Sequence, residues 1–111
     1  MSYKVLFLEY AEHDLRNIHA YVEQQFSLPL ANQVYTGIKN AILLLENKPD
    51  LGRKLPQLTH LGITDFRQLV VARKNKVVYQ IDEDQQHIYI HLICNERQDF
   101  DAVLTQRLLD T

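Results

Sequence analysis

The chain has 111 residues, of which 46% are hydrophobic and 23% are charged. These values are ordinary for a soluble globular domain, so we expect one domain spanning residues 1–111. Twelve Lys and Arg against 14 Asp and Glu give a formal charge of -2, which excludes an overall positive field for nucleic acid. The single cysteine, Cys94, excludes an internal disulfide and a CxxC redox pair.

The sequence lacks the usual signals for export or membrane insertion. The apolar run from Val5 to Leu8 is too short for a signal-peptide core, and no small-residue cleavage site follows it. No apolar run has the length of a membrane-spanning helix. We therefore expect a cytoplasmic protein without a membrane partner. Cys94 ends an apolar run, which favours a buried, inert thiol.

The first predicted element is a strand over Tyr3–Leu8, which is apolar nearly throughout and is therefore expected inside a sheet rather than at its edge. An amphipathic helix follows from Ala11, with apolar side chains at spacings of three and four. The start of this helix has no good capping residue, and acidic residues such as Glu9 partly compensate through the helix dipole. The apolar positions are Ala11, Leu15, Ile18, Val22 and Phe26.

A second helix is predicted after Ser27, which can cap it, with Pro29 tolerated in its first turn. It ends by Asn47, and Gly37 within it indicates close packing against a neighbour. The two helices should form an antiparallel hairpin lying on the sheet. The apolar face of the second helix comprises Ala31, Val34, Tyr35, Ile38, Ala41, Ile42 and Leu45.

Residues 48–64 are predicted to be a loop, punctuated by prolines and glycines, that presents Arg53 and Lys54. Three runs rich in β-branched and aromatic residues then predict an antiparallel meander over 65–71, 76–81 and 87–94. Together with the first strand they make a four-stranded sheet. Asp99 can cap a final short helix.

Strict alternation along 87–94 predicts which face of the sheet each side chain occupies. One set forms the core face beneath the helices and comprises Ile88, Ile90, Leu92 and Cys94. The other set forms a mixed face that nothing else in the sequence obviously covers, and comprises His87, Tyr89, His91 and Ile93.

Ordinary metal, cofactor or hydrolase chemistry is not indicated. His87 and His91 are about 13 Å apart along a strand, whereas zinc ligands must converge within about 2 Å of the ion. The sequence has no Gly-rich phosphate loop and no recognisable Ser or Cys nucleophile motif. We expect no metal and no cofactor.

Seven cations concentrate in the loop and the meander, where they could bind phosphate or an acidic peptide. Arg73, Lys74 and Lys76, near the predicted hairpin turn, could equally contribute only to solubility. Arg67 and Arg97 are flanked by apolar residues and need a partner, which a structural salt bridge to Asp65, Glu96 or Asp99 could provide. The seven are Arg53, Lys54, Arg67, Arg73, Lys74, Lys76 and Arg97.

In this order of elements the chain resembles the RelE/ParE superfamily of toxins from type II toxin–antitoxin systems. The resemblance rests on several short motifs spread over nearly the whole length. They are Ala11-x-x-Asp14-Leu15-x-x-Ile18-x-x-Tyr21, Ile42-x-x-Leu45, Pro49-x-x-Gly52-Arg53, Phe66-Arg67-Gln68-Leu69, Lys76-Val77-Val78-Tyr79-Gln80-Ile81 and Asn95-Glu96-Arg97-Gln98-Asp99-Phe100.

The resemblance implies an α/β (α+β) fold of order β-α-α-β-β-β-α, in which a two-helix hairpin packs on a curved, mostly antiparallel sheet and the first strand pairs with the last. It also implies neutralisation by a cognate antitoxin within a toxin–antitoxin hetero-oligomer. For antitoxin or target binding, we expect the open sheet face and the basic residues to serve. This candidate set is Arg53, Lys54, Arg67, Lys76, His87, Tyr89, His91 and Arg97.

The superfamily holds two activities. RelE-like members cleave mRNA on the ribosome, and Arg67, Lys76 and Arg97 match positions where those enzymes place cations. However, Leu69 stands where a second basic residue is expected, and the region around Phe100 has no Tyr or His for proton transfer. The closing residues, including Leu104-x-x-Arg107-Leu108, look more like the ParE branch, whose members inhibit DNA gyrase without enzymatic chemistry. The alternatives are a ribosome-dependent mRNA endoribonuclease and a non-toxic antitoxin-binding module.

Overall fold

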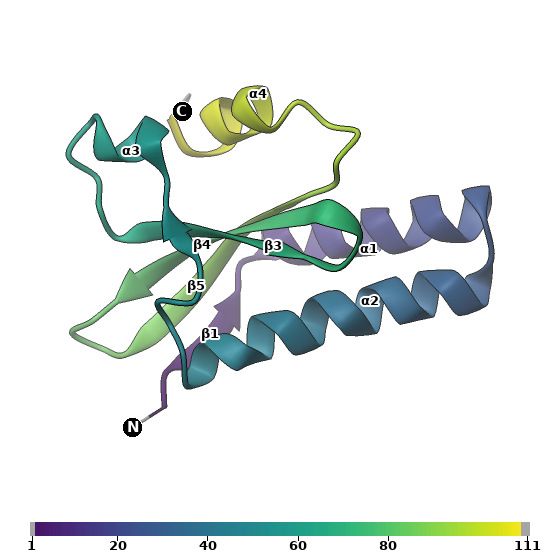
Figure 1. Cartoon of the computed structure of the whole chain (residues 1–111), viewed down its shortest axis with the longest axis horizontal. Helices are drawn as coiled ribbons and strands as arrows, with labels where there is room; N and C mark the ends of the chain where they lie inside the picture. Colours follow the sequence, from purple (N-terminus) through teal and green to yellow (C-terminus); the bar gives the residue numbers. More distant parts are fainter. Residues whose placement is uncertain (1, 110–111) are drawn as a thin grey trace.

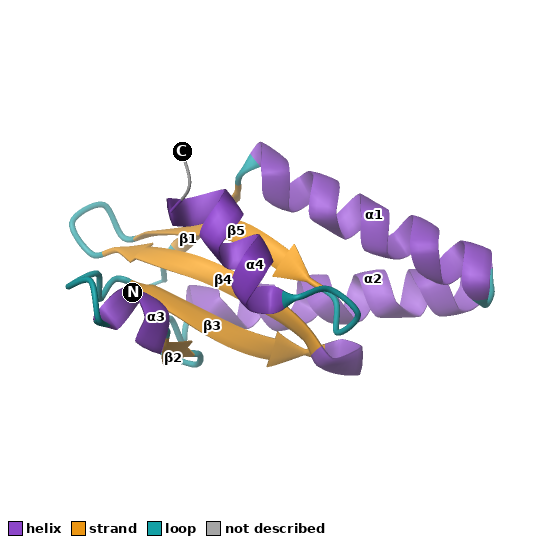
Figure 2. Cartoon of the chain, turned by 90° about the horizontal axis from the view of Figure 1, so that it is seen from above, coloured by secondary structure: helices purple, strands orange, loops and turns teal. Residues whose placement is uncertain are grey.

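The computed structural model describes residues 2–109 and has three layers (Figures 1 and 2). A five-stranded sheet of order β1-β5-β4-β3-β2 forms the middle layer. The long helices α1 and α2 cover one face, and the short helices α3 and α4 cover the other. The predicted α+β architecture is confirmed, with one strand more than the four expected.

The sheet is antiparallel except at β1, which pairs in parallel with β5. The predicted pairing of the first strand with the last is therefore confirmed. The predicted meander corresponds to β3, β4 and β5. The strand bounds are β1 Lys4–Phe7, β2 Arg53–Lys54, β3 Phe66–Val71, β4 Asn75–Asp82 and β5 His87–Cys94.

The prediction that the first strand lies inside the sheet is wrong, because β1 is an edge strand. Val5 and Phe7 pack into the core beneath the helices, and the Lys39 ammonium lies 5.5 Å from the Phe7 ring centroid. Helices and a neighbouring strand thus shield its apolar side chains without a second strand partner. The strand is only four residues long, which limits the exposed backbone edge.

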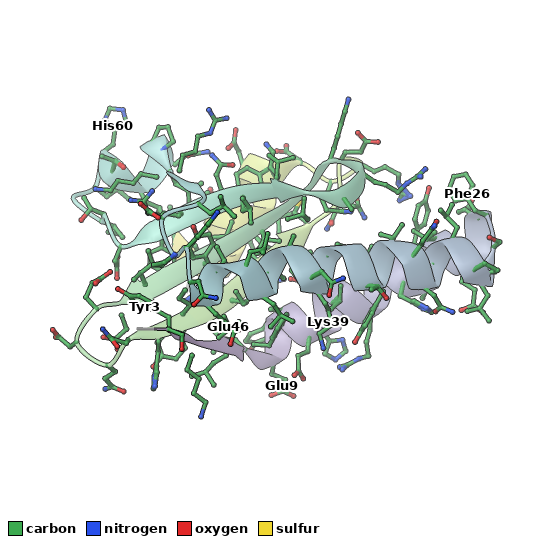
Figure 3. All side chains as sticks on the ribbon, turned by 60° about the horizontal axis from the view of Figure 1, so that its bottom comes forward. Tyr3, Glu9, Phe26, Lys39, Glu46 and His60 are labelled. Carbon is green, nitrogen blue, oxygen red and sulfur yellow. The ribbon has the colours of Figure 1, made fainter. Side chains whose placement is uncertain are left out.

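The predicted helical hairpin is confirmed as α1 (Glu9–Gln25) and α2 (Leu28–Leu43), extended by a 3₁₀ turn over Leu44–Glu46. The Ser27 hydroxyl caps α2 by accepting the N–H of Leu30 at 3.2 Å. The apolar faces of both helices form the main core with the sheet. Figure 3 shows Phe26 at the free tip of the hairpin, where 61% of it is exposed.

The predicted face assignment along β5 is wrong from Leu92 onward, because the strand contains a β-bulge at His91. Val78 pairs with Leu92 while the next residue, Tyr79, pairs with Ile90, so His91 is the extra residue. A bulge reverses the alternation that follows it. Ile93 consequently joins the core beneath the helices, whereas Leu92 moves to the opposite face.

The opposite face is also not open, contrary to the prediction, because a second apolar cluster covers much of it. Cys94, buried as predicted, lies in this cluster on the α3 and α4 side. The Asp99 carboxylate caps α4 (Phe100–Leu104) as predicted, accepting the N–H of Ala102 at 3.2 Å. The buried members of the cluster are Leu55, Leu58, Val78, Leu92, Cys94 and Leu104.

The segment 48–64 is more ordered than the predicted loop. It contains β2 and the one-turn helix α3 (Pro56–Thr59), which buries Leu55 and Leu58. Single-sequence patterns miss these elements because each has too few residues for a periodicity. Their position comes from contacts with the sheet instead.

Candidate functional site

The segment that leads into β2 is held against the sheet by the buried Tyr79. Its hydroxyl donates to the carbonyl of Pro49 at 2.7 Å and accepts the N–H of Gly52 at 2.8 Å. Arg67 donates from Nη1 to the carbonyl of Gly52 at 2.7 Å. Burial raises the pKa of Tyr79, so the hydroxyl keeps its proton and can continue to donate. Arg67 thereby has a structural bonding partner, although no carboxylate pairs with it in residues 2–109.

This anchored segment presents Arg53 and Lys54 at the edge of the sheet. Both side chains are exposed, and their backbones pair with Gln68 and Arg67 of β3. Gly52 is required at the approach to this edge, because an added Cβ would lie 2.4 Å from the Gln68 carbonyl oxygen. The fold therefore holds the backbones of Arg53 and Lys54 in a defined position at the sheet edge.

Lys76 lies on the other face of the sheet from Arg67. Its register partner is Cys94, and its ammonium lies 4.4 Å from the ring centroid of Phe100, within cation–π range. Arg67 instead pairs with Tyr79, whose side chain is in the core beneath the helices. The sheet thus separates the side chains of Arg67 and Lys76.

Arg97 occupies a third location, beside the first helix. Its guanidinium carbon lies 3.8 Å from the ring centroid of Tyr21, a stacked arrangement. The structural salt bridge considered for Arg67 and Arg97 is not found in the described chain, where neither has a carboxylate within 4.0 Å. Asp65 accepts a hydrogen bond from Gln80 instead. The fold therefore does not gather Arg67, Lys76 and Arg97 around one point.

His87, Tyr89 and His91 do share a face of β5, the one that also carries α3 and α4. His87 Nδ1 lies 3.2 Å from the Tyr89 hydroxyl, and the two rings meet edge to face. His91 Nε2 lies 2.9 Å from Gln80 Oε1, and its ring packs on Phe66 at 4.9 Å. Burial lowers the pKa of His91, with Arg107 adding to the effect and Asp65 opposing it.

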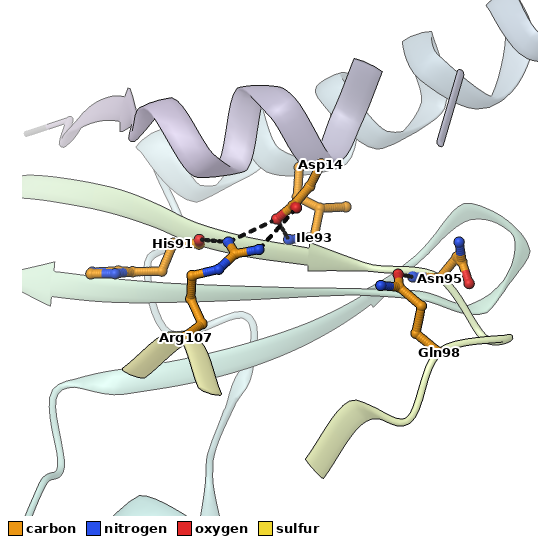
Figure 4. A network of polar contacts seen from close by, with 6 residues as sticks. All are labelled: Asp14, His91, Ile93, Asn95, Gln98 and Arg107. Carbon is orange, nitrogen blue, oxygen red and sulfur yellow. Dashed lines mark hydrogen bonds and ion pairs between the residues drawn. The ribbon is translucent and has the colours of Figure 1, made fainter. Parts of the chain in front are cut away.

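A network around the bulge was not identified as a site from the sequence (Figure 4). Arg107 donates to both carboxylate oxygens of Asp14 at 3.1 Å and to the carbonyl of His91 at 3.0 Å. The same carboxylate accepts the N–H of Ile93 at 3.0 Å. These contacts satisfy backbone groups of β5 beyond the end of β1. Asp14 and Arg107 each belong to a sequence motif named above, but their separation of 93 residues conceals the pairing.

Within 2–109, no three His, Cys, Asp or Glu side chains come together in a group that could hold a metal ion. No helix in that range combines the length and the apolar character required to cross a membrane.

The same fold occurs in solved toxin structures. A chain of the chromosomal ParDE toxin–antitoxin system from P. aeruginosa matches with a TM-score of 0.67 at 16% identity, covering 85% of this chain and 96% of that one. A mutant of the E. coli toxin RelE in the free state matches with a TM-score of 0.63 at 18% identity, covering 98% and 100%. A chain of the RelBE2 toxin–antitoxin complex from Mycobacterium tuberculosis gives 0.55 at 16% identity, covering 86% and 100%. These matches define a toxin fold of the RelE/ParE type.

The family follows from the sequence itself. The model of the ParE toxin of the type II toxin–antitoxin system parDE matches residues 5–100. The chain therefore belongs to the ParE toxin family. A search of the curated proteins gave no match.

Proposed function

We propose that this ParE-family toxin inhibits DNA gyrase without catalysing a reaction, and that a cognate antitoxin neutralises it by binding. The absence of catalysis is inferred from the separation of Arg67, Lys76 and Arg97 in the fold. RNA cleavage requires groups held together around one phosphate and positioned for proton transfer. Arg67 is bonded to Gly52 beneath the helices, while Lys76 packs on Phe100 on the opposite face.

The remaining cations support binding rather than catalysis. Arg53 and Lys54 are exposed on a fixed strand edge, and Arg97 is held by stacking on Tyr21. Guanidinium and ammonium groups supply positive charge and N–H donors but no acceptor. Such an array suits recognition of carboxylates on a protein partner.

For the antitoxin, we propose the sheet face on the α3 and α4 side, toward the end that carries His87 and Tyr89, together with Arg53 and Lys54. His87 and Tyr89 are only partly buried and turn their polar atoms toward one another. His91 contributes through its packing on Phe66, since its ring is already hydrogen-bonded. A crosslink from Tyr89 to the antitoxin is expected, and an antitoxin bound only to the α1–α2 hairpin would contradict this placement.

The test of function is DNA supercoiling by purified gyrase in the presence of micromolar toxin. We expect inhibition, and we expect it to disappear when the toxin is first mixed with the antitoxin encoded by the neighbouring reading frame. Unimpeded supercoiling at that concentration would contradict the proposal. Harmless induction of the toxin in cells without antitoxin would favour a non-toxic binding module.

The ribonuclease alternative has its own test. Codon-phased mRNA cleavage in a translating extract, abolished by Arg97→Ala, would establish that activity in place of gyrase inhibition. Arg16→Ala is the matched control, since Arg16 is an exposed arginine on α1 outside the proposed site. Loss of cleavage in both variants would point to an effect of net charge rather than of Arg97.

A further inference from the structure

A groove lies where the helical hairpin meets the turn between β3 and β4, away from the antitoxin face proposed above. Its cavity has a volume of about 230 Å³. The apolar side chains of Ile18, Val22 and Val34 line it, while Arg73 and Arg97 supply positive charge. The groove lies next to Asn75, where β4 begins, and next to Asn95, which follows the end of β5. His87 begins β5 at the other end of that strand, about 23 Å from Cys94. The groove and the antitoxin face are thus at opposite ends of the strands.

Both arginines in the groove rest on aromatic rings. Arg97 stacks on Tyr21 at 3.8 Å, and the guanidinium of Arg73 lies 5.8 Å from the ring centroid of Phe26. Among residues 2–109, no carboxylate lies within 4.0 Å of either guanidinium, including that of Glu96 on the groove rim. The close contact with Tyr21 orients the Arg97 guanidinium while leaving the N–H groups in its plane free to donate. The groove therefore offers two anion-binding groups, of which that of Arg97 is held against a ring.

The backbone around both arginines is held in place. Arg73 and Lys74 have φ values of 57° and 62°, in the left-handed region that is unfavourable for side-chain-bearing residues. The buried Asn75 maintains this turn by donating from its side chain to the carbonyl of Ala72 at 2.7 Å. Beside Arg97, the Asn95 side chain accepts the Arg97 N–H at 2.9 Å.

The turn at Asn95 is closed from its other side as well, because the Asn95 N–H donates to the Gln98 side chain at 3.1 Å (Figure 4). The backbone that carries the two arginines is therefore pre-formed. Less conformational freedom is lost when a partner binds to groups that are already ordered.

We propose that this groove is the surface by which the toxin engages its protein target, and that it accepts a carboxylate side chain neighbouring an apolar one. The inference rests on the proposed function, in which the target is gyrase. One guanidinium group matches a carboxylate in charge and in bidentate hydrogen-bonding geometry, and the second arginine adds to the positive field of the groove. The apolar floor, together with the exposed Phe26 and Leu28 at the hairpin tip, matches an adjoining apolar side chain. The antitoxin face remains separate, so neutralisation does not require the antitoxin to fill the groove.

The test compares two variants that change the formal charge equally. Arg73→Gln/Arg97→Gln removes both cations of the groove, whereas Arg16→Gln/Lys48→Gln removes two exposed cations outside it. The groove variant should need at least about tenfold more protein to inhibit gyrase supercoiling, while the control variant should act as the wild type. Affinity for the antitoxin should stay within about twofold for both, and the thermal midpoint should report whether each is folded.

The possible outcomes distinguish failure of the inference from failure of the proposed function. A wild-type toxin that inhibits gyrase, with a folded groove variant equally potent, overturns the inference and leaves the proposed function standing. A groove variant that binds the antitoxin more weakly but inhibits gyrase as well as the wild type would show that the groove binds the antitoxin and not the target, which overturns the inference. A wild-type toxin that leaves supercoiling intact contradicts the proposed function and the inference together. Arg97→Lys, which retains the charge but cannot stack as a planar group, should fall between the wild type and Arg97→Gln.

Discussion

Arg107 and Asp14 form a two-pronged ion pair, with both nitrogen–oxygen distances at 3.1 Å. The pair joins the π-helical segment Thr105–Leu109, which follows α4, to α1 across 93 residues of sequence. The pairing of β1 with β5 ends at Ile90. Beyond that point the ion pair bonds to the backbone of His91 and Ile93 instead. Side chains thus replace a missing strand partner at the bulge.

Breaking this pair should destabilise the protein more than an exposed ion pair would. The side chains of Arg107 and Asp14 are only 24% and 14% exposed, so removing either leaves a partly buried charge and an unsatisfied backbone group. We expect Arg107→Ala to lower the free energy of unfolding by about 2 kcal/mol. Urea unfolding of Arg107→Ala, Asp14→Ala and the double variant would measure the coupling. Strictly additive losses would show that the two side chains act independently.

Tyr79→Phe should destabilise the protein by removing the hydroxyl that joins Pro49 to Gly52. The buried N–H of Gly52 would lose its acceptor, and the expected cost is about 1–3 kcal/mol. Tyr35→Phe is the matched control, since the Tyr35 hydroxyl has no hydrogen-bond partner in the described chain. Thermal unfolding of both variants compares them directly, and equal midpoints would show that the Tyr79 hydroxyl has no anchoring role.

Gly52→Ala and Gly37→Ala should have different effects. A Cβ on Gly52 would lie 2.4 Å from the Gln68 carbonyl oxygen and 2.8 Å from the Tyr79 hydroxyl, so backbone must move. We expect a loss of about 3 kcal/mol. A Cβ on Gly37 would approach only the Ala72 Cβ, at 3.3 Å, and the gain in helix propensity offsets that contact. Chemical denaturation should therefore find Gly37→Ala within about 1 kcal/mol of the wild type, and a larger loss there than at Gly52 would contradict this account.

His91 should make stability depend on pH in the mildly acidic range. Its folded-state pKa is lowered from 6.5, chiefly by burial, so the unfolded chain binds a proton more readily than the folded chain. Stability should consequently fall as pH decreases from about 6.5 through the lower folded pKa. Asp65 opposes this effect and Arg107 reinforces it. His91→Gln should flatten the thermal midpoint against pH over that window. An unchanged slope in the variant would assign the pH dependence to other groups.

Much of the fold could be predicted from local patterns because the physical causes are local. The spacing of Leu15, Ile18 and Val22 predicts a helix, and the Ser27 and Asp99 side chains cap helices where predicted. Residue types and their alternation predict strands at 66–71, 75–82 and 87–94 within a residue or two. The sequence likewise indicates the concentration of cations in the second half of the chain.

What remained unpredictable depends on contacts between distant segments. The extra residue at His91 reverses the faces of Leu92 and Ile93, and no alternation rule applied to β5 alone can locate it. β2 and α3 exist because Tyr79, Arg67 and the apolar cluster hold them against the sheet.

The cations illustrate the same division between sequence and tertiary structure. The residue pattern predicts that Arg67, Lys76 and Arg97 lie in or next to strands. It does not predict that they point to separate places, because sheet register and helix packing set the direction of each side chain. Arg97 stacks on Tyr21 because α1 passes beside the end of β5, a relationship between segments far apart in the chain.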